Sequence, residues 1–105
     1  MTIKRLLIAN RGEIASRIIS SAHDMGISCV AIYTEADKDT PYVREADQAF
    51  KLSDSYLNSK EILDIALKSN SDAIHPGYGF LSENAAFANQ VKKLNIKWVG
   101  PSANA

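Results

Sequence analysis

Short apolar runs alternate with amphipathic segments along the whole chain, and this alternation most restricts the possible fold. Each apolar run has the length of a buried strand, and each segment between runs spaces its apolar residues as a helix does. Strands that alternate with helices build a parallel sheet with right-handed crossovers. The sequence therefore predicts an α/β fold, a Rossmann-like open parallel sheet of about five strands with flanking helices.

The spacing of apolar residues and turn residues gives the expected boundaries. We expect strands at residues 3–9, 27–33, 48–52, 72–74 and 96–99. We expect helices at 13–25, 58–69 and 84–94, and a single helical turn at 43–46. The polar stretch 34–42 is expected to be a loop. The first helix has Ile14, Ile18, Ala22 and Met25 on one face, and Gly26 follows it as a C-cap glycine.

Composition narrows the class of protein. The 105 residues fit one domain, and the 12 basic and 12 acidic residues balance without a basic block, so nucleic acid is not an expected partner. No apolar run approaches the ~20 residues that span a bilayer, so no membrane partner is expected. No transit peptide is apparent, and the single cysteine, Cys29, fits a reducing compartment. We expect the cytoplasm, or the mitochondrial matrix if the source is eukaryotic.

A glycine-rich segment between the fourth strand and the last helix is the main candidate for binding. Gly77 and Gly79 bracket Tyr78, so the backbone can adopt positive φ or approach another molecule closely. Ligands bind at the carboxyl ends of strands in open α/β sheets, which is where this segment lies. The alternative is a purely structural joint between strand and helix, with Tyr78 half-buried.

The residues around these glycines favour a capped helix and no metal site. Ser82 is a plausible N-cap, and Glu83 would then lie in the first turn, where the helix dipole favours a carboxylate. Ser82 lacks the Gly-x-Ser-x-Gly setting of a nucleophile. No second histidine or cysteine is near His75, so we expect no metal ligands.

A second candidate is the turn at residues 10–13, between the first strand and the first helix. A dinucleotide-binding fingerprint needs three glycines here, and only Gly12 is present. We expect instead a capped turn, with Glu13 and Arg17 forming an i,i+4 surface pair.

Taken together, these segments resemble the N-terminal domain of biotin carboxylase. The resemblance covers essentially the whole chain and rests on Ile8-Ala9-Asn10-Arg11-Gly12-Glu13-Ile14-Ala15, Arg17-Ile18, Tyr56-Leu57, residues 75–84 and Val99-Gly100-Pro101. The segment 75–84 is the most specific of these. The segment 42–47 looks like the corresponding segment of acyl-CoA carboxylases and their relatives.

The resemblance implies that residues 1–105 are the domain that precedes an ATP-grasp domain in a longer chain. The parent enzyme would use MgATP and bicarbonate to carboxylate biotin on a carrier domain. Its partners would be the ATP-grasp and C-terminal parts of the same chain, the biotin carboxyl carrier domain and a carboxyltransferase component. The family's ATP-binding, metal-binding and catalytic residues come later in the chain. The isolated fragment is therefore expected to be inactive, to contain no catalytic residue and to bind neither ATP nor biotin tightly.

The resemblance also assigns site residues. In the family, the residues matching Tyr78, Gly79 and Glu83 lie beside the biotin ureido ring, and the one matching Arg17 lies near the same pocket. We expect five further residues to support these loops without contacting biotin, and we call them the loop scaffold: His75, Pro76, Gly77, Asn10 and Gly12. Two alternatives stay open: the corresponding domain of another ATP-dependent ligase, and a non-catalytic interaction module.

Overall fold

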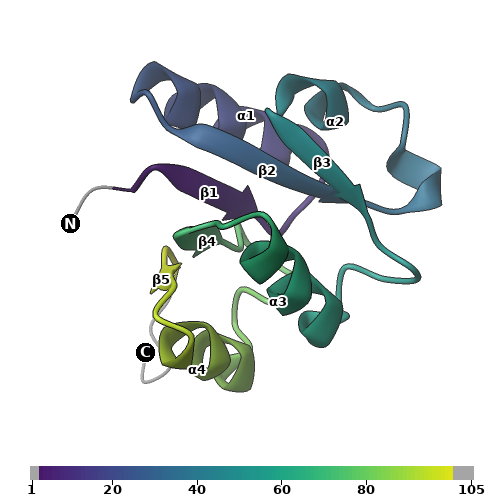
Figure 1. The fold of residues 1–105 in the computed structure, drawn as a ribbon. Coiled ribbons are helices and arrows are strands. Elements are labelled where there is room, and N and C mark those ends of the chain that lie inside the picture. Colours follow the sequence, from purple (N-terminus) through teal and green to yellow (C-terminus); the bar gives the residue numbers. More distant parts are fainter. Residues whose placement is uncertain (1–2, 101–105) are drawn as a thin grey trace.

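In the computed structural model, which describes residues 3–100, helices cover both faces of one parallel sheet (Figure 1). In chain order the elements are β1 (Arg5–Ile8), α1 (Gly12–Asp24), β2 (Ser28–Tyr33), the 3₁₀ helix η1 (Glu35–Asp37), α2 (Pro41–Glu45), β3 (Gln48–Lys51), α3 (Ser59–Lys68), β4 (Ala73–His75), α4 (Ala85–Lys93) and β5 (Lys97–Trp98). The five strands lie in the order β3-β2-β1-β4-β5, and all neighbours pair in parallel. The predicted fold class is confirmed.

The sheet separates two apolar cores. α1 and α2 lie on one face and α3 and α4 on the other (Figure 1). Successive side chains of β1 point into opposite cores. Leu6 lies in the core with Ile19 of α1. Leu7 lies in the other core, with Ile62 of α3 and Phe87 of α4. Burial on both faces explains why the three central strands, β1, β2 and β4, read as continuous apolar runs. None of the described helices has the length and apolar character needed to cross a membrane.

The strand order creates a switch point at β1. The chain leaves β1 through α1 toward β2 on one side, and later returns to pair β4 on the other side. The segments that follow β1 and β4 therefore meet at the carboxyl edge of the sheet, where the Ala9 N–H donates to the His75 carbonyl at 2.9 Å. Crevices at such switch points are the usual ligand sites of open α/β sheets.

The stretch predicted to be a loop at 34–42 is more ordered than expected. It contains η1 and the first residues of α2, so the predicted turn at 43–46 is in fact the helix Pro41–Glu45. Pro41 suits the first turn of a helix, because it has no N–H to leave unpaired. The Thr40 hydroxyl donates to the Asp37 carbonyl at 2.7 Å and joins the two short helices.

The predicted N-cap of the last helix was wrong. Asn84 is the N-cap of α4, and its Oδ1 accepts from the Phe87 N–H at 2.9 Å. Ser82 is buried in the preceding turn, where its N–H donates to the Gly79 carbonyl at 2.9 Å. Glu83 consequently lies before the helix, exposed, and not in its first turn.

Candidate functional site

The glycine-rich segment after β4, which we call the glycine loop (residues 76–84), has the backbone that the sequence predicted. Gly77 and Gly79 have φ values of +65° and +74°, and Phe80 has φ +46°. Tyr78 lies between two of these left-handed residues, and it is 71% exposed rather than half-buried. The loop thus presents an aromatic ring to solvent at the carboxyl edge of the sheet.

Asn10, which follows β1, fixes the position of the glycine loop. Its buried side chain donates through Nδ2 to the carbonyls of Pro76 and Tyr78, both at 2.8 Å. Its Oδ1 accepts from the Arg11 N–H at 2.8 Å. A Cβ at Gly77 would lie 2.6 Å from Asn10 Nδ2, so only glycine permits this approach. Asn10, Pro76 and Gly77 therefore form one connected unit between the two loops.

His75 acts within the same scaffold. Its Nδ1 accepts the Gly77 N–H at 3.0 Å, which places the ring proton on Nε2. Burial lowers the pKa of His75, because the charged imidazolium is poorly solvated there. The ring is therefore neutral at neutral pH and shapes the start of the loop.

The glycine loop and α1 enclose a hollow of about 210 Å³. It is lined by Ile14, Arg17, Ile18, His75, Gly77 and Tyr78. Arg17 reaches it from α1, with an exposed side chain whose Nε lies 3.3 Å from Glu13 Oε1, so the predicted surface pair is confirmed. The structure therefore brings together two predicted binding residues, Arg17 and Tyr78.

Gly79, Glu83 and Gly12 do not line this hollow. A Cβ at Gly79 would meet open space, and Glu83 is exposed four residues further along. Gly12 begins α1 with φ +65° and also faces open space.

Comparison with known proteins identifies the family. The sequence model described as "Biotin carboxylase, N-terminal domain" matches residues 2–105. The chain belongs to this family. It is 55% identical over 108 residues to Biotin carboxylase 1 of Bacillus subtilis, covering 98% of this chain and 24% of that protein. It is 49% identical to pyruvate carboxylase of Staphylococcus aureus, covering 94% of this chain and 9% of that protein. The chain thus spans a quarter or less of these two relatives.

Solved structures agree with this assignment. The biotin carboxylase domain of Hydrogenobacter thermophilus 2-oxoglutarate carboxylase, in complex with MgADP, ADP and bicarbonate, superimposes with a TM-score of 0.94 at 42% identity. The match covers 99% of this chain and 24% of that chain. Pyruvate carboxylase of Rhizobium etli also gives a TM-score of 0.94, at 36% identity, covering 99% of this chain and 11% of that chain. This biotin carboxylase N-terminal domain therefore has the fold of its family.

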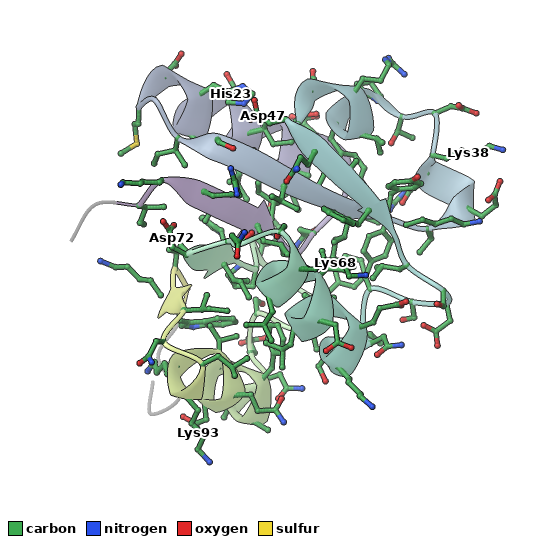
Figure 2. All side chains as sticks on the ribbon, in the orientation of Figure 1. His23, Lys38, Asp47, Lys68, Asp72 and Lys93 are labelled. Atoms are coloured by element: carbon green, nitrogen blue, oxygen red, sulfur yellow. The ribbon has the colours of Figure 1, made fainter. Side chains whose placement is uncertain are left out.

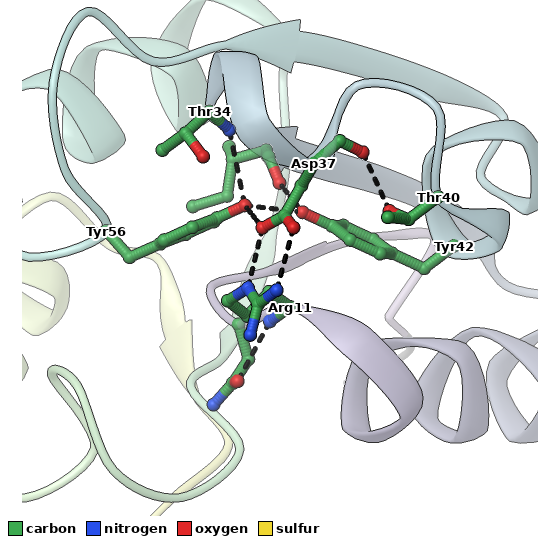
Figure 3. A network of polar contacts seen from close by, with 8 residues as sticks. Arg11, Thr34, Asp37, Thr40, Tyr42 and Tyr56 are labelled. Atoms are coloured by element: carbon green, nitrogen blue, oxygen red, sulfur yellow. Dashed lines mark hydrogen bonds and ion pairs between the residues drawn. The ribbon is translucent and has the colours of Figure 1, made fainter.

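One feature of the domain was not predicted: a polar network behind the first turn (Figure 3). Arg11 forms a bidentate pair with Asp37, with Nε–Oδ2 and Nη2–Oδ1 distances of 2.6 and 2.7 Å. The Tyr56 hydroxyl donates to Asp37 Oδ2 at 2.6 Å and lies 2.7 Å from the Tyr42 hydroxyl, which donates to the Ile32 carbonyl at 2.9 Å. The network ties β2, η1 and α2 to the turn after β1.

The charges in this network are mutually compensated. The hydrogen bonds from Arg11 and then Tyr56 hold the pKa of the buried Asp37 carboxyl below its usual value, although burial opposes the shift. Burial raises the pKa of Tyr42, so its phenol stays protonated and can donate. A paired buried carboxylate resists rearrangement, because breaking the pair leaves an uncompensated charge.

The network also reaches the glycine loop. The rings of Tyr56 and Phe80 pack with centroids 5.3 Å apart. Phe80 therefore anchors one side of the loop on Tyr56, while Asn10 holds the other side. Tyr56 was part of the family resemblance, but the polar stretch around Asp37 gave no sign of a buried carboxylate.

Proposed function

We propose that this chain is the N-terminal domain of an ATP-dependent biotin carboxylase and forms one wall of its biotin site. The observation that carries the proposal is the shared hollow of Arg17 and Tyr78, which come from segments far apart in the sequence. Membership of the biotin carboxylase family supports the reaction class. We also propose that the parent enzyme lies in the cytoplasm, or in the mitochondrial matrix if the source is eukaryotic, because the single cysteine fits a reducing compartment.

The chemistry of the hollow suits a flat ureido ring, which has one carbonyl and two N–H groups. The exposed ring of Tyr78 offers a face for packing, and the guanidinium of Arg17 offers donors to the ureido carbonyl. The open space at Gly79 lets a ligand approach the backbone closely. Glu83 lies outside the hollow, and we assign it to the rim, where its carboxylate accepts from a ureido N–H or orients a basic group.

Within the proposed enzyme, this chain binds and orients. MgATP and bicarbonate supply the activated carboxyl group, and biotin on its carrier domain receives it. The sequence has no Gly-x-x-x-x-Gly-Lys phosphate loop, so ATP binding is assigned to the ATP-grasp part of the parent chain. The further proposed partners are the C-terminal part of that chain, the biotin carboxyl carrier domain and a carboxyltransferase component.

The test is a chimera in which this chain replaces the matching segment of Biotin carboxylase 1 of Bacillus subtilis. We expect the chimera to cleave ATP in a biotin-dependent and bicarbonate-dependent manner. The substitution Tyr78→Ala should raise the KM for free biotin about tenfold, which is about 1.4 kcal/mol, and leave the KM for ATP unchanged.

A chimera that folds and binds ATP but shows no biotin-dependent cleavage would contradict the proposal. That result would favour the domain of another ATP-dependent ligase, or an interaction module. Leu94→Ala is the matched control, and its KM for biotin should stay unchanged. Leu94 is a partly exposed apolar residue at the C-cap of α4, at the amino edge of the sheet and away from the glycine loop.

A further inference from the structure

Three side chains of the kinds that ligate transition metals meet at the amino edge of the sheet. His23 comes from the last turn of α1, Cys29 from the start of β2, and Asp47 from the residue before β3. Their ligating nitrogen, sulfur and oxygen atoms all lie within 4.8 Å of one another. Figure 2 shows His23 and Asp47 together beside the end of α1. The cluster was not expected from the sequence, in which Asp47 lies 24 residues from His23 and 18 residues from Cys29.

Two hydrogen bonds set the positions of Cys29 and Asp47, one between backbone groups and one from a backbone N–H to the carboxylate. The Asp47 N–H donates to the Cys29 carbonyl at 3.0 Å, and the Cys29 N–H donates to Asp47 Oδ2 at 2.7 Å. This pair continues the ladder between β2 and β3, which begins at the next residue of each strand. The sulfur and the carboxylate are therefore held near each other by the sheet itself.

The end of α1 brings the imidazole to the same place. The Gly26 N–H donates to the His23 carbonyl at 3.0 Å, and Gly26 reverses the chain with φ +77°. His23 Nε2 lies 2.8 Å from Asp47 Oδ2. Because α1 runs antiparallel to the strands, its last turn stands over the amino ends of β2 and β3.

We propose that His23, Cys29 and Asp47 bind a zinc ion, with water as the fourth ligand. Zinc takes nitrogen, sulfur and oxygen ligands at about 2.0–2.3 Å in a tetrahedron, so neighbouring ligand atoms lie about 3.3–3.5 Å apart. The His23–Asp47 separation of 2.8 Å needs to widen by about 0.5 Å for this geometry. The Cys29 sulfur lies no more than 4.8 Å from the ligating atoms of His23 and Asp47. It needs to move toward them by about 1.5 Å or less to reach the tetrahedral spacing.

Charge and access agree with this geometry. A thiolate and a carboxylate neutralise a divalent ion, and imidazole binds it in the neutral form. The thiol proton is released when the zinc–sulfur bond forms, so binding is expected to tighten as pH rises. The side chains of His23 and Asp47 are 40% and 47% exposed, so the ion reaches the buried Cys29 from their side.

This zinc site is separate from the proposed biotin wall. The glycine loop lies at the carboxyl edge of the sheet, and the three ligands lie at the amino edge. A zinc ion there ties the end of α1 to β2 and β3. Zinc that binds only the folded chain raises the free energy of unfolding by RT ln(1 + c/Kd), where c is the zinc concentration, so the melting temperature rises with zinc concentration.

The test uses the 105-residue chain with zinc in calorimetry and with cobalt(II) as a spectroscopic substitute. We expect one zinc per chain, a dissociation constant of about 10 μM or lower, and a thiolate-to-cobalt charge-transfer band. Cys29→Ala should abolish that band, and His23→Gln should weaken zinc binding at least tenfold. Asp24→Asn, next to His23 on the same exposed turn, should bind zinc as the unaltered chain does.

Several results would overturn the proposal. They are a stoichiometry well below one, zinc binding unaffected by His23→Gln, or loss of binding in His75→Gln with His23 intact. Circular dichroism checks that each variant folds. Because His23 is exposed, His23→Gln decides the question even if Cys29→Ala proves unstable.

Discussion

The side chain of Asn10 and the backbone of Tyr78, 68 residues apart, are joined by a hydrogen bond of 2.8 Å between Nδ2 and the carbonyl oxygen. A second bond of the same length runs from Asn10 to the Pro76 carbonyl. The turn after β1 thus sets where the glycine loop stands. The ring that we assign to biotin binding is positioned by the residue that ends the first apolar run.

Asn10→Ala should lower the free energy of unfolding by about 2 kcal/mol, because it leaves buried carbonyls without a donor. Urea denaturation measures the change. Asn89→Ala on the exposed face of α4 is the control, expected within about 0.5 kcal/mol of the unaltered chain. Equal stability of the two variants would show that Asn10 does not hold the loop.

Gly77→Ala should destabilise the chain more than Gly79→Ala. Both residues have positive φ, so each alanine adds strain of about 1–2 kcal/mol. A Cβ at Gly77 also lies 2.6 Å from Asn10 Nδ2, whereas one at Gly79 meets nothing within 4 Å. The difference in urea midpoint between the two variants isolates the clash with Asn10. Equal losses in both variants would contradict the close approach.

The backbone of the glycine loop could be predicted and its contacts could not. Glycine adopts positive φ more readily than other residues, so Gly77 and Gly79 predict this backbone from their own positions in the sequence. Asn10 donates hydrogen bonds to residues 66 and 68 positions further along the chain. The residues next to Asn10 in the sequence do not indicate such distant partners. The same reason applies to Asp37. Its neighbours look solvated, yet a distant arginine and tyrosine satisfy its charge and allow burial.

The N-cap of α4 was mispredicted for a different reason. Ser82 and Asn84 are both good N-cap residues, and propensity alone does not choose between them. The turn at 81–83 uses Ser82 for a bond to Gly79, which leaves Asn84 to begin the helix. Tertiary placement of Leu81 in the core decides the outcome.

Tyr56→Phe should lower the free energy of unfolding by about 1.5–3 kcal/mol, because Asp37 loses a hydrogen bond to a charged acceptor. The pKa of Asp37 should rise in this variant, since the Tyr56 bond is one cause of its depression. Tyr33→Phe is the control, because the Tyr33 hydroxyl makes no hydrogen bond within the described residues. Urea denaturation measures stability, and titration followed by carboxyl NMR measures the pKa. An unchanged pKa of Asp37 would contradict the network.

His75 should make stability depend on pH. Its folded-state pKa lies below the usual value of about 6.5, so below that pH the unfolded chain takes up a proton that the folded chain refuses. The stabilisation is therefore complete above about pH 6.5 and is lost as pH falls through the folded pKa. Urea denaturation at a series of pH values measures this slope, and His75→Gln should flatten it. An equal slope in both proteins would refute the assignment of the neutral ring.

Glu83→Gln tests the rim of the proposed biotin site in the chimera. Glu83 is exposed and makes no hydrogen bond to another described residue, so the substitution should leave the melting temperature unchanged. The amide keeps the size of the side chain and removes its charge. Biotin-dependent ATP cleavage should therefore fall about ten- to a hundredfold, or roughly 1.4–2.8 kcal/mol of barrier. Asp64→Asn removes one exposed charge from α3 and is the matched control, with turnover expected to stay at the unaltered rate. If the two variants turn over equally, Glu83 has no part in the reaction and the wall reduces to Arg17, Tyr78 and the glycine backbone.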